Sequence, residues 1–295
     1  MSSGPRLSVN QFMVADLPLP ELASWCRRNG VTGIGVLRDT VRRLGADTVA
    51  TTLAAHGVVA TSVCVALGLI DADPARQRAR IADATAALDD AAKLGVPLVV
   101  VVGGPMPGLR LAQARQRAGE AVAELADRAG RCDARLLIEP LHPSAVHLSA
   151  FTTLREAATC AAGRPEIGVV LDTWHLWTDP DLYASIGRYG GFVDIVHVAD
   201  QPVDPAPDER EIPGDGVIDL VALARTVLAC GFAGWWELEV LSARLRDGCT
   251  AIELLDRSLA GLRRLLRAAG AGALGEGDVE GEHHANCHHR PTRIG

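Results

Sequence analysis

The chain has 295 residues, of which 48% are apolar and 22% are charged, and its formal net charge is −7. This length suits one large α/β domain, since a single α/β barrel takes about 250 residues. The acidic balance disfavours a nucleic-acid-binding surface, which needs an excess of basic side chains. The sequence shows no signal-peptide pattern and no apolar run of the roughly 18 residues that span a bilayer, so we expect a cytoplasmic protein without membrane contact.

Apolar segments of strand length and segments with helical patterning alternate along the chain. The predicted strands are Leu7–Val14, Gly33–Leu37, Val58–Leu67, Pro97–Val102, Ala134–Glu139, Ile167–Asp172, Asp194–Ala199 and Trp235–Val240. The predicted helices are Pro20–Asn29, Ala46–His56, Pro74–Leu94, Arg110–Gly130, Thr153–Ala162, Asp181–Tyr189, Leu220–Cys230 and Ile252–Ala269. Such alternation predicts parallel strands with right-handed crossovers. Eight units without a GxGxxG motif after the first strand favour a closed (β/α)8 barrel over an open doubly wound sheet.

The end of the chain differs from the rest in composition. Residues 271–295 are rich in glycine, then acidic residues, then histidine, with too few apolar side chains to form a core. We therefore expect a single barrel domain over residues 1–270 and a disordered tail over residues 271–295. The seven cysteines are scattered without a CxxC pair, which predicts free thiols and no disulfide framework.

Four successive predicted strands carry a carboxylate or an imidazole at or near their ends. The fifth ends in Glu139, the sixth ends in Asp172, and the seventh contains His197. The eighth carries Glu237 and Glu239, which point to the same side of a strand because they are two residues apart. Barrel enzymes place their chemistry at the carboxyl ends of the strands, so we expect these side chains to converge.

Converging carboxylates repel one another unless a cation lies among them, so this pattern predicts a bound divalent metal ion. Three oxygen ligands and one imidazole suit Mn²⁺, which we take as the first expectation, as well as Mg²⁺, Co²⁺ or Zn²⁺. By strand alternation alone, Glu237 and Glu239 are both candidates for the ligand from the eighth strand. Asp200 follows the seventh strand, and either orients His197 or caps the next segment.

Aromatic side chains lie near the same strand ends. Trp174 follows the sixth strand closely, and Phe12 is near the end of the first. Flat apolar faces beside polar anchors suit a sugar or cyclitol ring, so both are candidates for substrate binding. Trp177, Trp235 and Trp236 also lie near the proposed ligands, but alternation sends some of these tryptophans outward to pack between strands and helices.

Five segments of the chain carry a resemblance to a known family. They are IEPLHP (138–143), DTWH (172–175), HVAD (197–200), REIPGDGVID (210–219) and GFAGWWELE (231–239). Together they are similar to the xylose isomerase-like TIM barrel superfamily, which contains sugar phosphate isomerases and epimerases. Ketose 3-epimerases and inosose dehydratases belong to that group, and the endonuclease IV family is a distant relative. The resemblance extends over residues 5–268.

The resemblance implies roles for individual residues. The implied metal ligands are Glu139, Asp172, His197 and Glu239. The resemblance selects Glu239 because the family's ligand lies five residues after the glycine that Gly234 matches. It also implies that Glu139 and Glu239 transfer protons on the two faces of a substrate carbon, and that His175 and Arg210 bind substrate oxygens.

The implied activity is that of a divalent-metal-dependent isomerase or epimerase that acts on a sugar, keto-sugar or cyclitol through a metal-stabilised enediolate. The alternative is a lyase on the same scaffold, either an inosose-type dehydratase or a C-glycoside-cleaving subunit. An endonuclease IV-like nuclease would need more histidines near the strand ends, and a non-catalytic binding subunit would be expected to lack a ligand. The expected partner is a small carbohydrate or cyclitol, without nucleic acid, and a homo-oligomer is compatible with the sequence.

Overall fold

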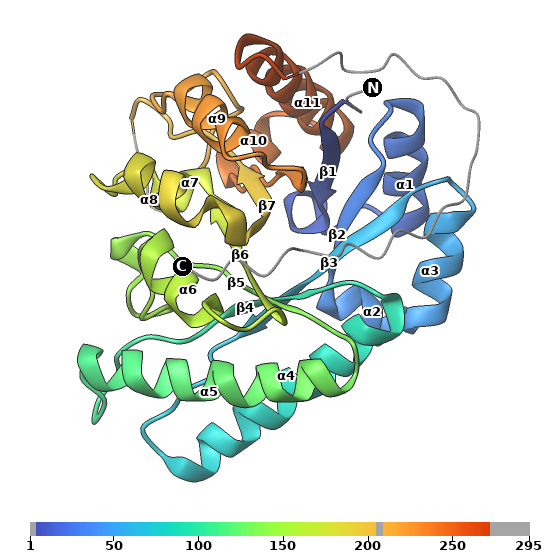
Figure 1. The fold of residues 1–295 in the computed structure, drawn as a ribbon. Coiled ribbons are helices and arrows are strands. Elements are labelled where there is room, and N and C mark those ends of the chain that lie inside the picture. The colour runs from blue at the N-terminus through green and yellow to red at the C-terminus, as the bar shows by residue number, and fades with distance from the viewer. Residues whose placement is uncertain (1–3, 205–208, 272–295) are drawn as a thin grey trace.

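The computed structural model describes residues 4–204 and 209–271, and it shows eight parallel strands closed into a barrel (Figure 1). Each strand pairs with its sequence neighbour, and β1 pairs with β8 to close the sheet. The strands are β1 (Arg6–Asn10), β2 (Gly33–Leu37), β3 (Val59–Leu67), β4 (Leu98–Val101), β5 (Leu136–Ile138), β6 (Ile167–Asp172), β7 (Val193–Val198) and β8 (Trp235–Leu238). The predicted (β/α)8 TIM barrel is confirmed.

Helices surround the barrel, with α4 and α5 forming one side of the ring (Figure 1). The α-helices are α1 (Leu19–Arg28), α2 (Arg38–Leu44), α3 (Ala46–Ala54), α4 (Pro74–Leu94), α5 (Leu111–Arg131), α6 (Leu154–Ala161), α7 (Thr173–Leu176), α8 (Leu182–Tyr189), α9 (Leu220–Ala229), α10 (Ala243–Gly248) and α11 (Ala251–Ala268). Short 3-10 turns are η1 (Gln11–Val14), η2 (Pro143–Ala145) and η3 (Gly190–Phe192). The eight predicted helices are present. The short α2, α7 and α10, which the patterning did not predict, lie in the connections that follow strands.

Local sequence signals explain where α4 begins and ends. The Asp73 carboxylate accepts hydrogen bonds from the backbone N–H groups of Ala75 and Arg76, and Pro74 occupies the first helical position. The helix ends at Gly95, whose φ of 68° is left-handed and therefore favours glycine. These two caps satisfy backbone groups that a helix leaves without internal partners.

The first strand is shorter than its apolar run predicted. It ends at Asn10, because the Asn10 side chain accepts a hydrogen bond from the Phe12 backbone N–H at 3.0 Å and starts the η1 turn. Phe12 therefore lies on a turn beyond the strand end, with 45% of its surface exposed.

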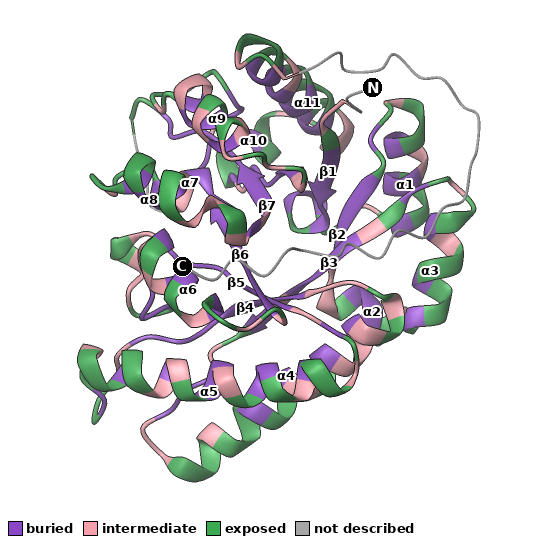
Figure 2. Ribbon diagram, viewed as in Figure 1, coloured by how far each residue is buried: buried purple, intermediate pink, exposed green. Residues whose placement is uncertain are grey.

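The barrel encloses one core and the helices cover another (Figure 2). The larger core lies mainly between the strands and the surrounding helices. The smaller one gathers Cys64, Val99, Leu137, Val170 and Ile195, which come from five neighbouring strands. Side chains alternate along a strand, so the residues two positions after Leu137, Val170 and Ile195 also point inward. Those residues are Glu139, Asp172 and His197.

Two expectations depend on where the described residues end. The predicted tail, residues 271–295, lies outside them except for Ala271, so its disorder and the domain boundary at 270 stay predictions.

The six cysteines within the described part are free thiols. None of the helices in residues 4–204 and 209–271 is long and apolar enough to cross a membrane.

Candidate metal centre

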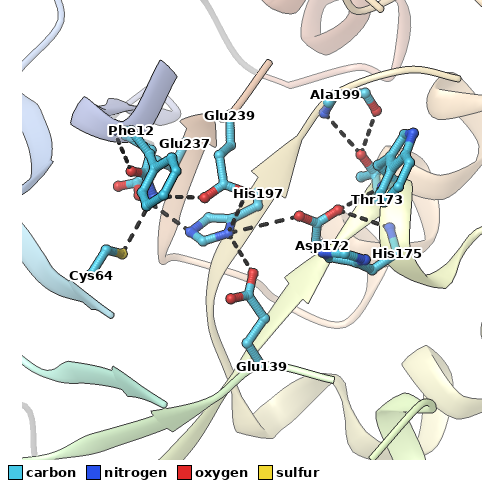
Figure 3. A network of polar contacts seen from close by, with 12 residues as sticks. Phe12, Cys64, Glu139, Asp172, Thr173, His175, His197, Ala199, Glu237 and Glu239 are labelled. Atoms are coloured by element: carbon cyan, nitrogen blue, oxygen red, sulfur yellow. Dashed lines mark hydrogen bonds and ion pairs between the residues drawn. The ribbon is translucent and has the colours of Figure 1, made fainter. Parts of the chain in front are cut away.

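Four side chains meet at the carboxyl end of the barrel (Figure 3). Glu139, Asp172, His197 and Glu239 each offer one ligand atom, and these atoms all lie within 4.8 Å of one another. At most 7% of the surface of any of these four residues is exposed. The tertiary structure thus brings together the residues that the sequence proposes as ligands.

The His197 ring divides the site into two sides. Its Nδ1 atom is 2.9 Å from Glu139 Oε1 and 3.3 Å from Glu239 Oε2, and it is 4.0 Å from Asp172 Oδ2. Its Nε2 atom faces the opposite way, 3.3 Å from Glu237 Oε1 (Figure 3). The nitrogen that faces the three proposed carboxylate ligands is therefore Nδ1.

Asp172 provides an oxygen for a cation while its other oxygen organises the backbone. Oδ1 accepts hydrogen bonds from the backbone N–H groups of Trp174 at 2.7 Å and His175 at 3.0 Å, which caps α7. Oδ2 is buried and accepts no well-aligned hydrogen bond within the described residues, and it forms an ion pair with Arg210, whose Nη1 atom lies 3.1 Å away. A buried carboxylate oxygen without a hydrogen bond is costly unless it coordinates or pairs with a cation. This atom, together with the surrounding donor set, fits a divalent metal ion.

Arg210 lies against the same carboxylates. Its Nη1 atom donates to Glu239 Oε2 at 2.6 Å and to the Glu239 backbone carbonyl at 2.8 Å. Burial alone would lower the pKa of Arg210, but Asp172 and Glu239 raise it above its ordinary value. The guanidinium therefore stays charged and offsets part of the negative charge at the site.

The pKa values of the two glutamates of the site are shifted in opposite directions. Burial raises the pKa of Glu139, and the nearby His197 only partly opposes this effect. Burial also favours the neutral form of Glu239, but His197 and Arg210 outweigh it and lower the Glu239 pKa. Burial by itself would lower the pKa of His197, whereas Glu239 and Glu139 raise it well above the ordinary value. Without a bound ion, Glu239 is thus held as a carboxylate, and Glu139 binds a proton more readily than Glu239 does.

His175 lies at the edge of the cluster as a neutral ring. The His142 backbone N–H donates to its Nδ1 atom at 3.1 Å. Its Nε2 atom lies 3.2 Å from Arg210 Nη2, which can only donate, so hydrogen-bond donors face both ring nitrogens. Burial lowers the His175 pKa to about 4, so the ring is uncharged at neutral pH.

Of the tryptophans near the strand ends, Trp174 is the one that contacts proposed site residues. Its ring lies 5.0 Å from the His175 ring in an edge arrangement and 5.0 Å from the Arg210 guanidinium carbon. Trp236 is buried outside the barrel against Phe232, with ring centroids 5.4 Å apart. Trp236 therefore packs between a strand and the surrounding helices, as strand alternation predicts for some of these tryptophans.

The remaining tryptophans near the strand ends do not form part of the cluster. Trp235 is covered by the Arg6 guanidinium, whose carbon lies 3.8 Å from the ring centroid. Trp177 is 36% exposed, beyond α7. Phe12 lies on the η1 turn after β1, where its backbone N–H donates to the side chain of Asn10, the residue that also binds Glu237 and Glu239, so its position is compatible with the mouth of the barrel.

Asp200 shapes the loop that carries Arg210. Its Oδ2 atom accepts hydrogen bonds from the backbone N–H groups of Gly214 at 2.9 Å and Gly216 at 3.1 Å, and Oδ1 accepts from Ile218 at 2.9 Å. Of the two sequence interpretations of Asp200, the structure shows the one in which it caps the following segment. The segment REIPGDGVID is thus a loop folded around one buried carboxylate.

The sequence interpretation missed a polar network below the metal centre. Glu237 is fully buried and accepts hydrogen bonds from Ser8, Asn10 and Thr61. Asn10 also donates to Glu239 Oε1 at 3.0 Å. The sequence did contain a signal for this network. Residues two apart on a strand point to the same side, so Glu237 must point into the barrel if Glu239 does, and a carboxylate buried there needs hydrogen-bond partners.

Comparisons with known proteins agree with this architecture. The family described as xylose isomerase-like TIM barrel matches residues 23–265. A solved structure of a protein from Sinorhizobium meliloti 1021 is 30% identical, with a TM-score of 0.83, and the match covers 88% of this chain and 98% of that one. A comparison with curated protein sequences finds no match.

Two more distant solved structures share the fold. An IolI protein, whose crystal structure is described as having a bound zinc atom, is 19% identical with a TM-score of 0.77, over 90% of this chain and 98% of that one. A D-psicose 3-epimerase from Clostridium cellulolyticum H10, solved with D-tagatose, is 14% identical with a TM-score of 0.74, over 90% of this chain and 99% of that one.

Proposed function

The chain belongs to the xylose isomerase-like TIM barrel family, and from this premise we propose that it is a divalent-metal-dependent isomerase or epimerase of a sugar, keto-sugar or cyclitol. The observation that carries the proposal is the convergence of three buried carboxylates and one buried imidazole, whose ligand atoms all lie within 4.8 Å of one another. The IolI protein with zinc and the epimerase with D-tagatose support the same class of chemistry.

In this proposal the metal ligands are Glu139, Asp172, His197 and Glu239, and Mn²⁺ is the first candidate ion, ahead of Mg²⁺, Co²⁺ and Zn²⁺. A divalent ion at this position supplies Lewis acidity, which makes the C–H bond next to a chelated carbonyl more acidic. Glu239 is already oriented by Arg210, which donates to its Oε2 atom at 2.6 Å. Without the ion, Glu139 pairs with His197 Nδ1, a contact that a bound ion would replace.

Proton transfer by the two glutamates accounts for the chemistry. Glu239, which is held as a carboxylate, removes the proton from the carbon next to the carbonyl. Glu139, in its protonated form, returns a proton to the resulting enediolate, and proton exchange with solvent restores the starting state of both glutamates. Return to the opposite face of the same carbon inverts that centre, and return to the adjacent carbon moves the carbonyl. The reverse assignment of the two glutamates serves the reverse reaction.

Substrate binding falls to residues around the glutamates. His175, whose ring is neutral, lies beside Arg210 at the edge of the site and offers its Nε2 atom to a substrate hydroxyl. Trp174 and Phe12 offer ring faces to the apolar side of a sugar or cyclitol. Arg210 already pairs with Glu239 and Asp172, so it holds the base and contacts a substrate hydroxyl, and an additional phosphate would have to compete with these two carboxylates.

The test is a substrate panel in heavy water. Purified protein with Mn²⁺ is incubated with ketoses, inososes and 3-keto-glycosides, and deuterium incorporation next to the carbonyl is followed by NMR and mass spectrometry. We expect deuterium in an isomer or epimer of one substrate class. Release of water or of an aglycone from the same substrates would instead support the lyase alternative, and hydrolysis without exchange would contradict both.

A further inference from the structure

Glu237 is a charged side chain in a position where neighbouring strands carry apolar ones. Two residues before the proposed ligands on β5, β6 and β7, the inward-pointing residues are Leu137, Val170 and Ile195, which pack together. The equivalent residue before Glu239 on β8 is Glu237, with none of its surface exposed. Burying a carboxylate here costs free energy unless specific partners compensate it.

The barrel provides these partners from two other strands. Ser8 Oγ and Thr61 Oγ1 donate to Glu237 Oε2 at 2.6 Å and 2.7 Å, and Asn10 Nδ2 donates to Oε1 at 3.1 Å. On β2, Gly35 leaves the space in which the carboxylate lies, since a Cβ atom there would be 2.3 Å from Glu237 Oε1. Residues of β1, β2 and β3 therefore form a built cradle for this one side chain.

The cradle places Glu237 against two of the proposed ligands. Its Oε1 atom is 3.3 Å from His197 Nε2, the ring nitrogen on the side away from the carboxylate ligands. That nitrogen is buried and has no well-aligned hydrogen bond in the described residues. The Asn10 amide that binds Glu237 Oε1 also donates to Glu239 Oε1 at 3.0 Å.

We propose that Glu237 is a positioning residue for the metal centre: it accepts the Nε2–H of His197 and so keeps the Nδ1 lone pair directed at the ion. Through Asn10 it also restrains Glu239. This inference rests on the metal centre proposed above. Carboxylates that accept a hydrogen bond from a metal-bound imidazole fix its tautomer and its orientation, and their loss typically costs about 10- to 100-fold in metal affinity.

A second metal ion held by Cys64, His197 and Glu237 is the competing interpretation, because their ligand atoms also lie within 4.8 Å of one another. The hydrogen bonds argue against it. Glu237 Oε2 already accepts from two hydroxyl groups and Oε1 from an amide. Burial raises the pKa of the Cys64 thiol to about 12, which disfavours the thiolate that a metal needs.

The experiment compares metal binding with folding in matched variants. Mn²⁺ affinity and stoichiometry are measured by calorimetry on the metal-depleted full chain, and thermal unfolding of the metal-free protein is followed by circular dichroism. The variants are Glu237→Gln, Glu237→Leu, Ser8→Ala and Cys64→Ala. Glu237→Leu extends the apolar packing of Leu137, and Ser8→Ala removes one hydrogen bond from the same carboxylate while leaving the acceptor for His197.

We expect the wild type to bind one ion. Affinity should fall about tenfold in Glu237→Gln and about 100-fold in Glu237→Leu, while both remain folded. Ser8→Ala should stay within about threefold of the wild-type affinity despite a lower unfolding temperature, because it loosens the network without removing the acceptor. In the Zn²⁺-loaded wild type, ¹⁵N NMR should show His197 protonated at Nε2 alone, and Glu237→Leu should show faster exchange of that proton.

Three results would overturn the inference. Unchanged affinity in folded Glu237→Gln and Glu237→Leu would show that Glu237 only fills space. Two ions in the wild type and one in Cys64→Ala would establish the second metal site instead. No binding by the wild type would overturn the metal centre itself, which separates failure of the proposed function from failure of this inference.

Discussion

Glu139 and Glu239 have the same side chain and the same strand position, yet their neighbours give them different properties. Within the described residues, Glu139 forms an ion pair with His197, whereas Glu239 forms ion pairs with both His197 and Arg210. Burial favours the neutral form of both glutamates; at Glu239 the two cations outweigh it and lower the pKa, whereas at Glu139 the effect of His197 is too small and the pKa is raised. Two carboxylates with separated pKa values suit an acid and a base acting on one substrate.

We expect Glu139→Gln to reduce turnover by about 10²- to 10⁴-fold, since the amide neither carries the proton nor matches the carboxylate as a ligand. The unfolding temperature of the metal-free protein should change little, because the amide is nearly isosteric. Steady-state kinetics and circular dichroism measure the two effects. Glu120→Gln, a matched change on the exposed face of α5, should behave as the wild type, and full activity in Glu139→Gln would refute its role.

His175→Ala should raise the Michaelis constant about tenfold, the effect of one lost hydrogen bond in a buried site, and change metal affinity less than about threefold. Because burial lowers the His175 pKa to about 4, the ring stays neutral over the usual assay range. The ratio of mutant to wild-type Michaelis constants should therefore be constant between about pH 5.5 and pH 8. A ratio that changes near the ordinary histidine pKa would contradict the assignment of a neutral ring.

At the scale of the element, the loop after β7 depends on one buried carboxylate. Asp200 accepts hydrogen bonds from backbone N–H groups spread over residues 201–218, and Arg210 lies between them in sequence. The antiparallel bridge between Asp200 and Glu211 fixes the start of the same loop. The position of the guanidinium is thus set by backbone contacts several residues away from it.

Asp200→Ala should lower the free energy of unfolding by about 2 to 4 kcal/mol, because four backbone N–H groups lose the buried carboxylate that accepts their hydrogen bonds. The Michaelis constant should rise as well, since Arg210 loses its support. Urea unfolding and kinetics measure these effects, and Asp200→Asn, which keeps one acceptor oxygen, should fall between the wild type and the alanine variant. Unchanged unfolding in Asp200→Ala would show that the loop holds its shape by other contacts.

At the scale of the whole molecule, two proposed ligands lie on β6 and β7 and two lie directly after β5 and β8, so an ion would link four of the eight strands. An ion that binds only the folded state stabilises it by about 2.7 kcal/mol at a concentration of 100 times Kd. The carboxylates that attract a cation also raise the pKa of His197 well above its ordinary value. Protons and metal therefore compete for the same Nδ1 atom.

This competition predicts the pH dependence of stability. Without metal, protonated His197 stabilises the fold below its unfolded pKa, and this contribution is lost as the pH rises through the folded-state pKa. Metal affinity changes in the opposite direction, so the increase in unfolding temperature on adding Mn²⁺ should grow with pH. Differential scanning calorimetry with Mn²⁺ or with a chelator measures it. Asp172→Asn, whose Oδ1 atom can still cap α7, should lose most of the increase, and an increase independent of pH and of Asp172 would contradict this site.

The sequence by itself determined the eight-unit alternation, the barrel and the convergence of the strand ends, because these follow from hydrophobic periodicity and from the shared direction of parallel strands. The family resemblance added the choice of Glu239 over Glu237, which periodicity leaves open since both point inward. Tertiary structure decided what depends on contacts between strands distant in sequence: Trp174 lies at the site and Trp236 behind it, and Asp200 folds a loop. It also decided that Glu237 lies in a cradle formed by Ser8, Gly35 and Thr61, because only barrel closure brings β1, β2 and β3 to the side chain of β8.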